Sequence, residues 1–166
     1  INIGGGCFGK MPDALKNQLG YEVPGFRQYA VAITNVLNRE FKNETKPKLI
    51  IEPGAALSAN CFTFVAEVLE IKKGNQRSYA VLNTSNVWLK PTKHALNLSF
   101  EVHNLSFSPP STYTLVANNC MENDMLGMYN GVLNTGDFVV FNNVGAYASS
   151  FGSEFIVGKA LTVDLD

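Results

Sequence analysis

The sequence predicts an α+β fold in two parts, a βαβ unit followed by an all-β domain. Two observations carry this prediction. The first 54 residues combine short apolar runs with one stretch of helical periodicity, whereas later segments alternate between apolar and polar positions. The chain has 166 residues, of which 46% are hydrophobic and 16% are charged, as in ordinary globular proteins. A chain of this length can bury a core.

Each element of the first part has its own signal. Ile1–Ile3 is typical of the end of a buried strand, and Gly4-Gly5-Gly6 of the turn after it. The short apolar run Leu49-Ile50-Ile51 predicts a strand buried on both faces. Between them, apolar residues recur every three or four positions, which predicts an amphipathic helix: Phe26, Tyr29, Ile33, Leu37 and Phe41.

Parallel strands need neighbours that these 54 residues do not contain. We therefore expect the chain to be a piece of a longer protein. In isolation, residues 1–54 should be poorly ordered or packed against another copy, because their apolar faces lack partners.

The second part carries a series of short strand signals separated by Gly, Pro and Asn turns. The predicted strands are Phe62–Ile71, Tyr79–Leu82, Leu96–Val102, Tyr113–Ala117, Asp137–Phe141 and Glu154–Val157. Strands of this length and spacing predict a Greek-key sandwich or barrel. The chain thus divides into residues 1–54 and residues 55–166.

Charge and hydropathy exclude several partners. Thirteen Lys and Arg against 14 Asp and Glu give a net charge of −1, so no basic field attracts nucleic acid or an anionic membrane. No apolar run approaches the roughly 18–20 residues that span a bilayer. His94 and His103 lack thiol or carboxylate partners at ligand spacing, so no metal site is predicted.

The cysteines and sequons bear on the compartment. Cys7, Cys61 and Cys120 are far apart and odd in number, so they form no disulfide framework. Cys61, in an apolar run, is predicted to be a buried inert thiol, whereas Cys120 lies in a polar loop that suits a reactive one. Four Asn-x-Ser/Thr triplets would accept glycans in a secreted protein: Asn43, Asn83, Asn97 and Asn104. The unpaired cysteines and the lack of a leader pattern favour a cytoplasmic chain.

Several residues are candidates for chemistry, each with a plainer alternative. The glycine triplet is a phosphate cradle or a structural turn. Glu52 ends a buried strand, where parallel α/β structures place their sites. Tyr147 is a core aromatic or a phenol that donates to an anion. Cys120 and Asp124 share one polar loop.

The order of these motifs is more specific than any one of them. The chain carries Gly-Gly-Gly, Glu-Pro-Gly, Cys-x-x-x-Asp, Gly-Asp and Gly-Ala-Tyr in sequence. This order resembles the fold-type III pyridoxal-phosphate decarboxylases, which act on diaminopimelate, ornithine, carboxynorspermidine and related compounds. The matching stretches are Ile3–Phe8, Ile50–Lys72, Leu82–Pro91, Leu115–Leu126 and Gly136–Tyr147.

The resemblance covers only the carboxyl-terminal portion of such an enzyme. It implies that residues 1–54 are the last βαβ piece of an α/β (TIM-like) barrel that binds pyridoxal 5′-phosphate. Residues 55–166 would then be the carboxyl-terminal β-domain.

The resemblance also implies roles for residues at the cofactor. Gly5 and Gly6 match glycines whose backbone N–H groups bind the cofactor phosphate. Glu52 matches the glutamate that faces the pyridine nitrogen and keeps it protonated. Gly54 belongs to the same cofactor-binding segment, and Tyr147 matches a tyrosine that donates to the phosphate.

Other matches concern the substrate and the partner subunit. Cys120 matches a cysteine that acts as a general acid in the partner subunit's active site. Asp124 matches an aspartate at the subunit interface, so the family pattern implies a homodimer with shared active sites. Lys90 stands where the family has an arginine that contacts substrate, and it could pair with a carboxylate as a point charge.

Besides Lys90, further departures from the family pattern concern specificity and activity. Ala55 replaces the usual arginine after Glu-Pro-Gly, and Met121 replaces an acidic residue that reads the substrate's distal amine. These departures argue against diaminopimelate or ornithine as the substrate, so we expect another amino-acid-like compound: a basic amino acid, a carboxylated polyamine or a siderophore precursor. No residue here matches the family's cofactor-bearing lysine, and Lys10 is predicted to be a surface residue, so residues 1–166 alone should be inactive. The alternatives are a secreted glycosylated β-sandwich binding module and a non-catalytic decarboxylase homologue.

Overall fold

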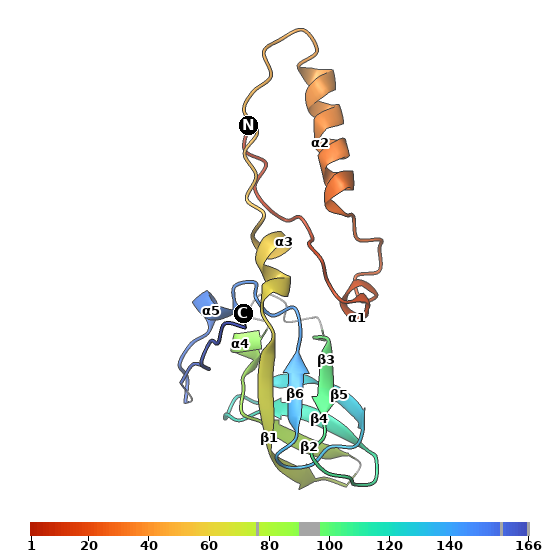
Figure 1. Cartoon of the computed structure of the whole chain (residues 1–166), viewed down its shortest axis with the longest axis vertical. Helices are drawn as coiled ribbons and strands as arrows, with labels where there is room; N and C mark the ends of the chain where they lie inside the picture. The colour runs from red at the N-terminus through yellow and green to blue at the C-terminus, as the bar shows by residue number, and fades with distance from the viewer. Residues whose placement is uncertain (76, 90–96, 157, 166) are drawn as a thin grey trace.

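The computed structural model describes residues 1–75, 77–89, 97–156 and 158–165. The molecule is elongated, with an N-terminal unit at one end and a β-domain at the other (Figure 1). The N-terminal unit holds α1 (Asp13–Lys16) and α2 (Phe26–Glu40). A short helix, α3 (Gly54–Ser58), and the 3-10 turn η1 (Ala59–Cys61) lead into the β-domain.

The two strands of the N-terminal unit pair in parallel, as the βαβ prediction requires. Asn2 forms a parallel bridge with Ile50. The N–H of Ile3 donates to the Ile50 carbonyl at 3.1 Å, and the N–H of Ile50 donates to the Ile1 carbonyl at 2.9 Å. Helix α2 lies between these two paired segments in the sequence, in the order that a βαβ unit requires, although the segments form an isolated bridge rather than full strands.

Helix α2 covers this strand pair only loosely. None of its residues is buried, and Phe26 at its start is 56% exposed. A cavity of about 360 Å³ separates α2 from the second strand, and Ile33 and Ile51 line it from opposite sides. The predicted helix is therefore present, but its apolar face meets few neighbours.

The β-domain contains one six-stranded sheet in the order β3-β6-β1-β2-β4-β5. The strands are β1 (Phe64–Lys73), β2 (Ser78–Leu82), β3 (Phe100–His103), β4 (Ser111–Ala117), β5 (Met125–Gly131) and β6 (Phe138–Phe141). Neighbouring strands are antiparallel except β2 and β4, which are parallel. Short helices α4 (Asn86–Leu89) and α5 (Ala148–Phe151) lie near the end that faces the N-terminal unit (Figure 1).

Strand β1 bends the sheet into half a barrel. Its first four residues pair with β6, and Val68–Lys73 pair with β2, with a register shift between Val68 and Glu70. The outer strands β3 and β5 approach each other through the rings of Phe100 and Tyr129, whose centroids are 6.2 Å apart. The enclosed core contains fully buried aliphatic and aromatic side chains, with Val68, Leu115 and Phe141 among the largest.

Four of the predicted strands appear where expected, and two differ. Strand β3 begins at Phe100, later than predicted, although residue 96 lies outside the described residues. The predicted strand Glu154–Val157 is wrong for its described residues, which form bends or irregular backbone. Ile156 has φ 66°, a left-handed conformation that interrupts an extended strand.

The sequence analysis also missed β5 and misjudged Cys61. Strand β5 contains two glycines and an asparagine, all of low strand propensity. A Cβ atom on Gly127 would lie 3.3 Å from the Phe100 ring, a tight contact that only a small shift of the ring would relieve. Cys61 is exposed, not buried. The apolar run around it lies at the uncovered start of β1, where Phe62 is 46% exposed.

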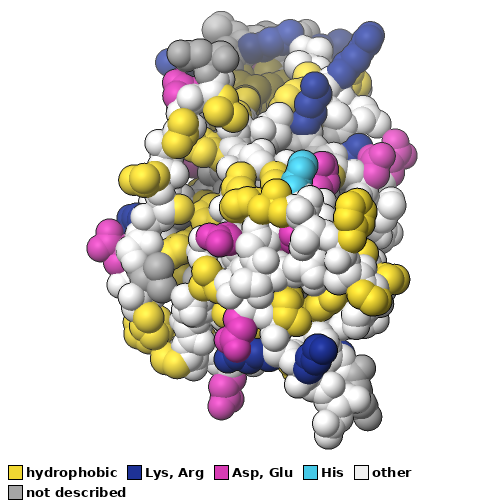
Figure 2. Space-filling view, turned by 60° about the horizontal axis from the view of Figure 1, so that its bottom comes forward, with side chains coloured by type: hydrophobic (Ala, Val, Ile, Leu, Met, Phe, Trp, Pro, Cys, Tyr) yellow, Lys and Arg dark blue, Asp and Glu magenta, His cyan; other side chains and the backbone are white. Residues whose placement is uncertain are grey.

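The end of the β-domain remote from the N-terminal unit carries Lys, Arg, Asp and Glu side chains mixed with apolar ones (Figure 2). Within the described ranges, no group of three or more His, Cys, Asp and Glu residues could hold a metal ion. No helix among those ranges is long and apolar enough to cross a bilayer.

Candidate functional site

The glycine loop lies directly beside Glu52. The parallel pairing continues past the strands, because the N–H of Glu52 donates to the Gly4 carbonyl at 2.7 Å. Gly4 (φ 69°) and Gly6 (φ 88°) adopt left-handed conformations that favour glycine. Gly5 has no room for a side chain, because its Cα packs against the Glu52 carbonyl.

Tyr147 reaches this loop from the far end of the sequence. After β6 the chain packs against η1, where the N–H of Gly145 donates to the Ala59 carbonyl at 2.9 Å. Tyr147 has φ 65°, and its ring lies edge-on to Phe151. A Cβ atom on Gly54 would lie only 2.6 Å from the Tyr147 hydroxyl, so a side chain at position 54 would displace that hydroxyl.

These residues enclose one cavity of about 390 Å³, within the size range of small-molecule sites. Its lining includes every residue predicted to bind the cofactor: Gly5, Gly6, Glu52, Gly54 and Tyr147. Lys10 and Ala55 also line it. Among the described lining residues, Glu52 is the only carboxylate and Lys10 the only cation. The fold thus brings together positions from both ends of the chain.

Asn2 fixes the Glu52 carboxylate in this cavity. Its side-chain amide donates to Glu52 Oε1 at 2.7 Å, and its carbonyl oxygen accepts from the N–H of Gly4 at 2.8 Å. No described residue makes a hydrogen bond to the other carboxylate oxygen, Oε2. One oxygen of Glu52 is therefore anchored and the other is available to a ligand.

The donor set of the cavity fits an anionic pyridine derivative. No described residue accepts a hydrogen bond from the N–H of Gly5 or Gly6, so both can bind phosphate oxygens. The Tyr147 hydroxyl and the Lys10 ammonium are further groups for an anion, and Glu52 supplies a carboxylate for a ring nitrogen. These groups suit the phosphate and the ring nitrogen of pyridoxal 5′-phosphate, whereas the lysine that bears the cofactor in the family has no counterpart among them.

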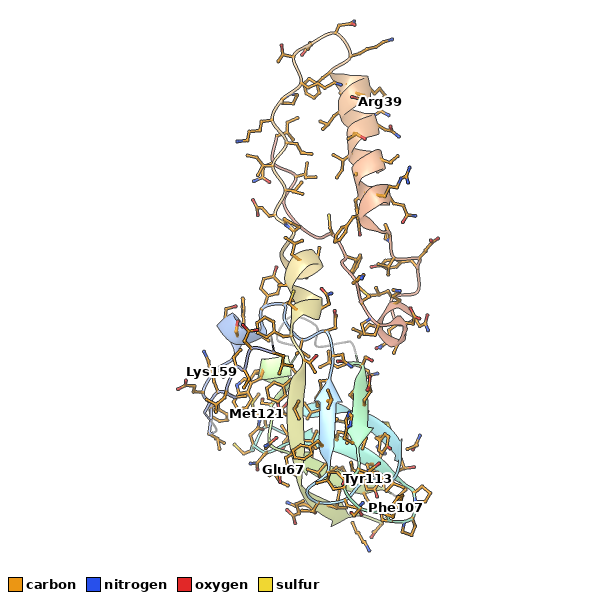
Figure 3. All side chains as sticks on the ribbon, viewed as in Figure 1. Arg39, Glu67, Phe107, Tyr113, Met121 and Lys159 are labelled. Carbon is orange, nitrogen blue, oxygen red and sulfur yellow. The ribbon has the colours of Figure 1, made fainter. Side chains whose placement is uncertain are left out.

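Cys120 and Asp124 lie elsewhere, on the β-domain. Cys120 is exposed and does not line the cavity of its own chain. Met121, the next residue, is 46% exposed and lies in the β-domain (Figure 3). The structure therefore does not bring Cys120 to Glu52 within one chain.

Asp124 is buried within its own chain, where it holds the Cys120 loop. Its carboxylate accepts hydrogen bonds from the Ser85 hydroxyl and the N–H of Asn86, both at 2.6 Å, and from the Asn119 side chain. Any effect of Asp124 at a subunit interface would therefore act through this loop. Lys90, predicted to contact substrate, lies outside the described residues.

Two residues at the cavity, Asn2 and Lys10, carry no sequence motif that would identify them as site residues. Asn2 lies within an apolar strand and belongs to no motif, and only the register with Ile50 puts it beside Glu52. Lys10 was predicted to be a surface lysine, and it is indeed exposed, but it lines the cavity. Its position four residues after the glycine triplet was the only available signal.

Comparisons with known proteins find similar sequences and structures for most of the chain. No protein-family model matches the chain. A diaminopimelate decarboxylase from Haemophilus influenzae is 28% identical over 124 residues, which cover 73% of this chain and 30% of that protein. Another from Vibrio cholerae is 27% identical over 157 residues, or 93% of this chain and 35% of that protein. The chain thus spans about a third of the length of these relatives.

Solved structures show the same fold over a similar share. The chain superposes on diaminopimelate decarboxylase from Helicobacter pylori, complexed with L-lysine, with a TM-score of 0.72 and 23% identity, covering 93% of this chain and 36% of that one. The corresponding enzyme from M. jannaschii gives a TM-score of 0.74 at 20% identity, with 93% of this chain and 35% of that chain covered.

An arginine decarboxylase from Paramecium bursaria Chlorella virus gives a TM-score of 0.69 at 18% identity, over 93% of this chain and 40% of that one. Diaminopimelate and arginine decarboxylases are pyridoxal-phosphate-dependent enzymes. The resemblance predicted from the motif order is confirmed: over about a third of their length, the chain is similar to the fold-type III pyridoxal-phosphate decarboxylases.

Proposed function

We propose that residues 1–166 are the carboxyl-terminal part of a pyridoxal-phosphate-dependent decarboxylase, a carbon–carbon lyase that acts on an amino-acid-like substrate. Residues 1–54 would end its barrel, and residues 55–166 would form its β-domain. The observation that carries this proposal is the single cavity lined by Gly5, Gly6, Glu52, Gly54 and Tyr147.

In this proposal the cavity residues bind and orient the cofactor. When bound, the cofactor supplies an electron sink for the bonding electrons left on the α-carbon as carbon dioxide leaves. Glu52 holds a proton on the ring nitrogen, since its anchored carboxylate favours the charged ring. The N–H groups of Gly5 and Gly6 and the Tyr147 hydroxyl hold the phosphate. In the family an arginine supplies positive charge here, but this chain has Ala55 at that position. The Lys10 ammonium would supply positive charge instead.

The remaining proposed roles require a second subunit. Cys120 would donate a proton in the partner's active site, and its exposure in a loop suits that role. The hydrogen bonds of Asp124 would keep the loop in place. Ala55 and Met121 argue against diaminopimelate and ornithine themselves, and the substrate we propose is another amino-acid-like compound: a basic amino acid, a carboxylated polyamine or a siderophore precursor. Lys90 remains a candidate contact for a substrate carboxylate.

A secreted glycosylated binding module is less well supported than the enzyme. The Asn104 side-chain amide, which a glycan would occupy, donates to the Val132 carbonyl and to Asp137 Oδ2, both at 2.8 Å. A glycan there would break these contacts. We therefore also propose that the protein acts in the cytoplasm, where its three free cysteines would remain reduced.

The test measures carbon dioxide release by the intact protein that carries this chain, loaded with pyridoxal 5′-phosphate, over basic amino acids and carboxylated polyamines. We expect release from at least one substrate and a loss of about 100-fold or more in Glu52→Gln, because the ring nitrogen loses its carboxylate. Glu101→Gln is the matched control, since Glu101 is exposed on β3, away from the cavity.

Unchanged release in Glu52→Gln would contradict the proposed role of the cavity. Cofactor binding without release from any substrate would favour the non-catalytic homologue. Failure to bind the cofactor would refute the proposal.

A further inference from the structure

The segment before the glycine loop carries Asn2, whose side chain contacts both Glu52 and the glycine loop. Asn2 donates to Glu52 Oε1 at 2.7 Å and accepts from the N–H of Gly4 at 2.8 Å. The two bonds determine the orientation of the amide. If it were reversed, its NH₂ group would face an N–H and its oxygen would face a carboxylate.

Strand register makes this bridge possible. Asn2 pairs in parallel with Ile50, two residues before Glu52, and the N–H of Glu52 donates to the Gly4 carbonyl at 2.7 Å. The Asn2 side chain thus spans from one strand to the end of the next. It engages Oε1 of Glu52, while no described residue makes a hydrogen bond to Oε2.

An exposed glutamate without such an anchor would sample several rotamers, and ordering it on binding would reduce ligand affinity. A hydrogen bond to a charged acceptor is among the stronger polar interactions in proteins. The Asn2 contact therefore holds the carboxylate in one orientation before a ligand arrives.

We infer that Asn2 is the positioning residue for Glu52: it holds Oε1 so that Oε2 faces the ring nitrogen of the bound pyridine compound. Through Gly4 it also links this carboxylate to the glycine loop that binds the phosphate. This inference rests on the proposed cofactor site. It adds a residue that acts on the ring only through Glu52.

The test compares two ligands that differ only at the ring position facing Glu52. Pyridoxine 5′-phosphate has no aldehyde, so it binds without reacting with lysines, and its 1-deaza analogue has carbon in place of the ring nitrogen. Calorimetric titration of the intact protein that carries this chain, freed of its own cofactor, gives the dissociation constant for each. We expect the unaltered chain to prefer the nitrogen compound by roughly 10-fold, the size of effect that one charged hydrogen bond gives.

Asn2→Ala and Asn2→Leu should each reduce this preference to about twofold or less, because Glu52 loses its anchor. Leu keeps the bulk of the side chain, so agreement between the two variants excludes a packing defect. Asn142→Ala is the matched control. Asn142 also contacts a glutamate, Glu101, at 3.4 Å but lies outside the cavity lining, so the preference should remain unchanged.

The outcomes separate this inference from the function on which it rests. A preference that survives both Asn2 variants would overturn the role of Asn2 and leave the cavity proposal standing. Equal weakening of both ligands would also overturn it, because Asn2 would then support only the glycine loop. An unaltered chain that shows no preference for the nitrogen compound would overturn both the inference and the proposed role of Glu52.

Discussion

The buried carboxylate of Asp137 holds together two loops of the β-domain, at Asn104 and Leu105 and at Asn134. It is fully buried and accepts hydrogen bonds from the N–H groups of Leu105 and Asn134, both at 2.7 Å, and from the Asn104 amide at 2.8 Å. Burial acts to raise the pKa of Asp137, but these hydrogen bonds outweigh it and hold the pKa below its ordinary value of 3.8. Phe107, two residues after Leu105, is fully exposed at the surface of the loop that Asp137 holds (Figure 3).

We predict that Asp137→Asn lowers the free energy of unfolding by about 2 kcal/mol at neutral pH, because an NH₂ group would replace an oxygen that accepts from N–H donors. Urea unfolding followed by the fluorescence of Trp88, the only tryptophan, measures this change. Asp164→Asn, in the exposed tail, is the control and should change stability by less than about 0.5 kcal/mol.

The same substitution should change the pH dependence of stability. A carboxyl whose pKa is lowered by folding contributes stability above its unfolded pKa, and that contribution is lost as the pH falls through the folded pKa. The difference between the unaltered chain and Asp137→Asn should therefore be constant above about pH 5 and shrink below about pH 3.8. A difference that grows on acidification would contradict this account.

At the scale of elements, α2 and the β-sheet differ in how much surface they bury. Helix α2 has 15 residues, none of them buried, and Arg39 near its end lies far from the β-domain (Figure 3). In contrast, β4 lies between two strands and holds Tyr113, Thr114 and Leu115 in a continuous buried run. Since a helix of this length is marginal without packing, α2 depends on neighbours that the described part of the chain does not provide.

We predict that amide hydrogens of α2 exchange faster than those of β4 by about two orders of magnitude or more, because opening α2 exposes little new apolar surface. Hydrogen–deuterium exchange with mass spectrometry compares both elements in one dilute sample. Protection of α2 that rises with protein concentration would show packing against another copy. Protection equal to that of β4 at every concentration would contradict the prediction.

At the scale of the molecule, the cavity forms where the N-terminal unit meets the β-domain. Beside it, the Gln18 side chain donates to the Asn97 carbonyl at 2.9 Å and accepts from the Asn97 N–H at 2.8 Å, joining the two parts. Cys120 lies outside this cavity, on the β-domain. A site that needs both Glu52 and Cys120 therefore requires two subunits.

We predict that inactive Glu52→Gln and Cys120→Ala forms of the intact protein restore activity when mixed. If subunits exchange at random, half of the dimers are mixed and one of their two sites is intact, so about a quarter of the normal rate should return. The activity of each variant mixed with unaltered protein serves as the reference for the extent of subunit exchange. No recovery despite demonstrated exchange would contradict a shared site.

Much of the fold could be predicted because the relevant signals are local. The period of Phe26, Tyr29 and Ile33 specifies a helix, and the alternating residues of β1 specify a strand. Strand β5 could not be predicted, because its glycines have low strand propensity. In the structure, its Gly127 lies close to the Phe100 ring, which comes from the opposite edge of the sheet. That contact depends on the curl of the sheet, which no local pattern encodes.

The same distinction holds for the site. Glu52 and the glycine loop could be selected because strand ends and glycine triplets are visible in sequence, and the motif order supplied Tyr147. Asn2 could not be selected, because its role comes from strand register and from two hydrogen bonds. Lys10 belongs to no recognisable sequence motif, and only the folded loop shows that it lines the cavity.

The strand order sets the sequence in which the cavity can assemble during synthesis. Strands β1 and β2 are joined by a short turn and can form a hairpin within microseconds. Strand β6 must close on β1 across more than 60 residues, a slower step, and only then does Tyr147 reach Gly54. A nascent chain that ends before β6 would carry the glycine loop and Glu52 but no closed cavity. Ligand binding would therefore be among the last properties to appear in a refolding experiment.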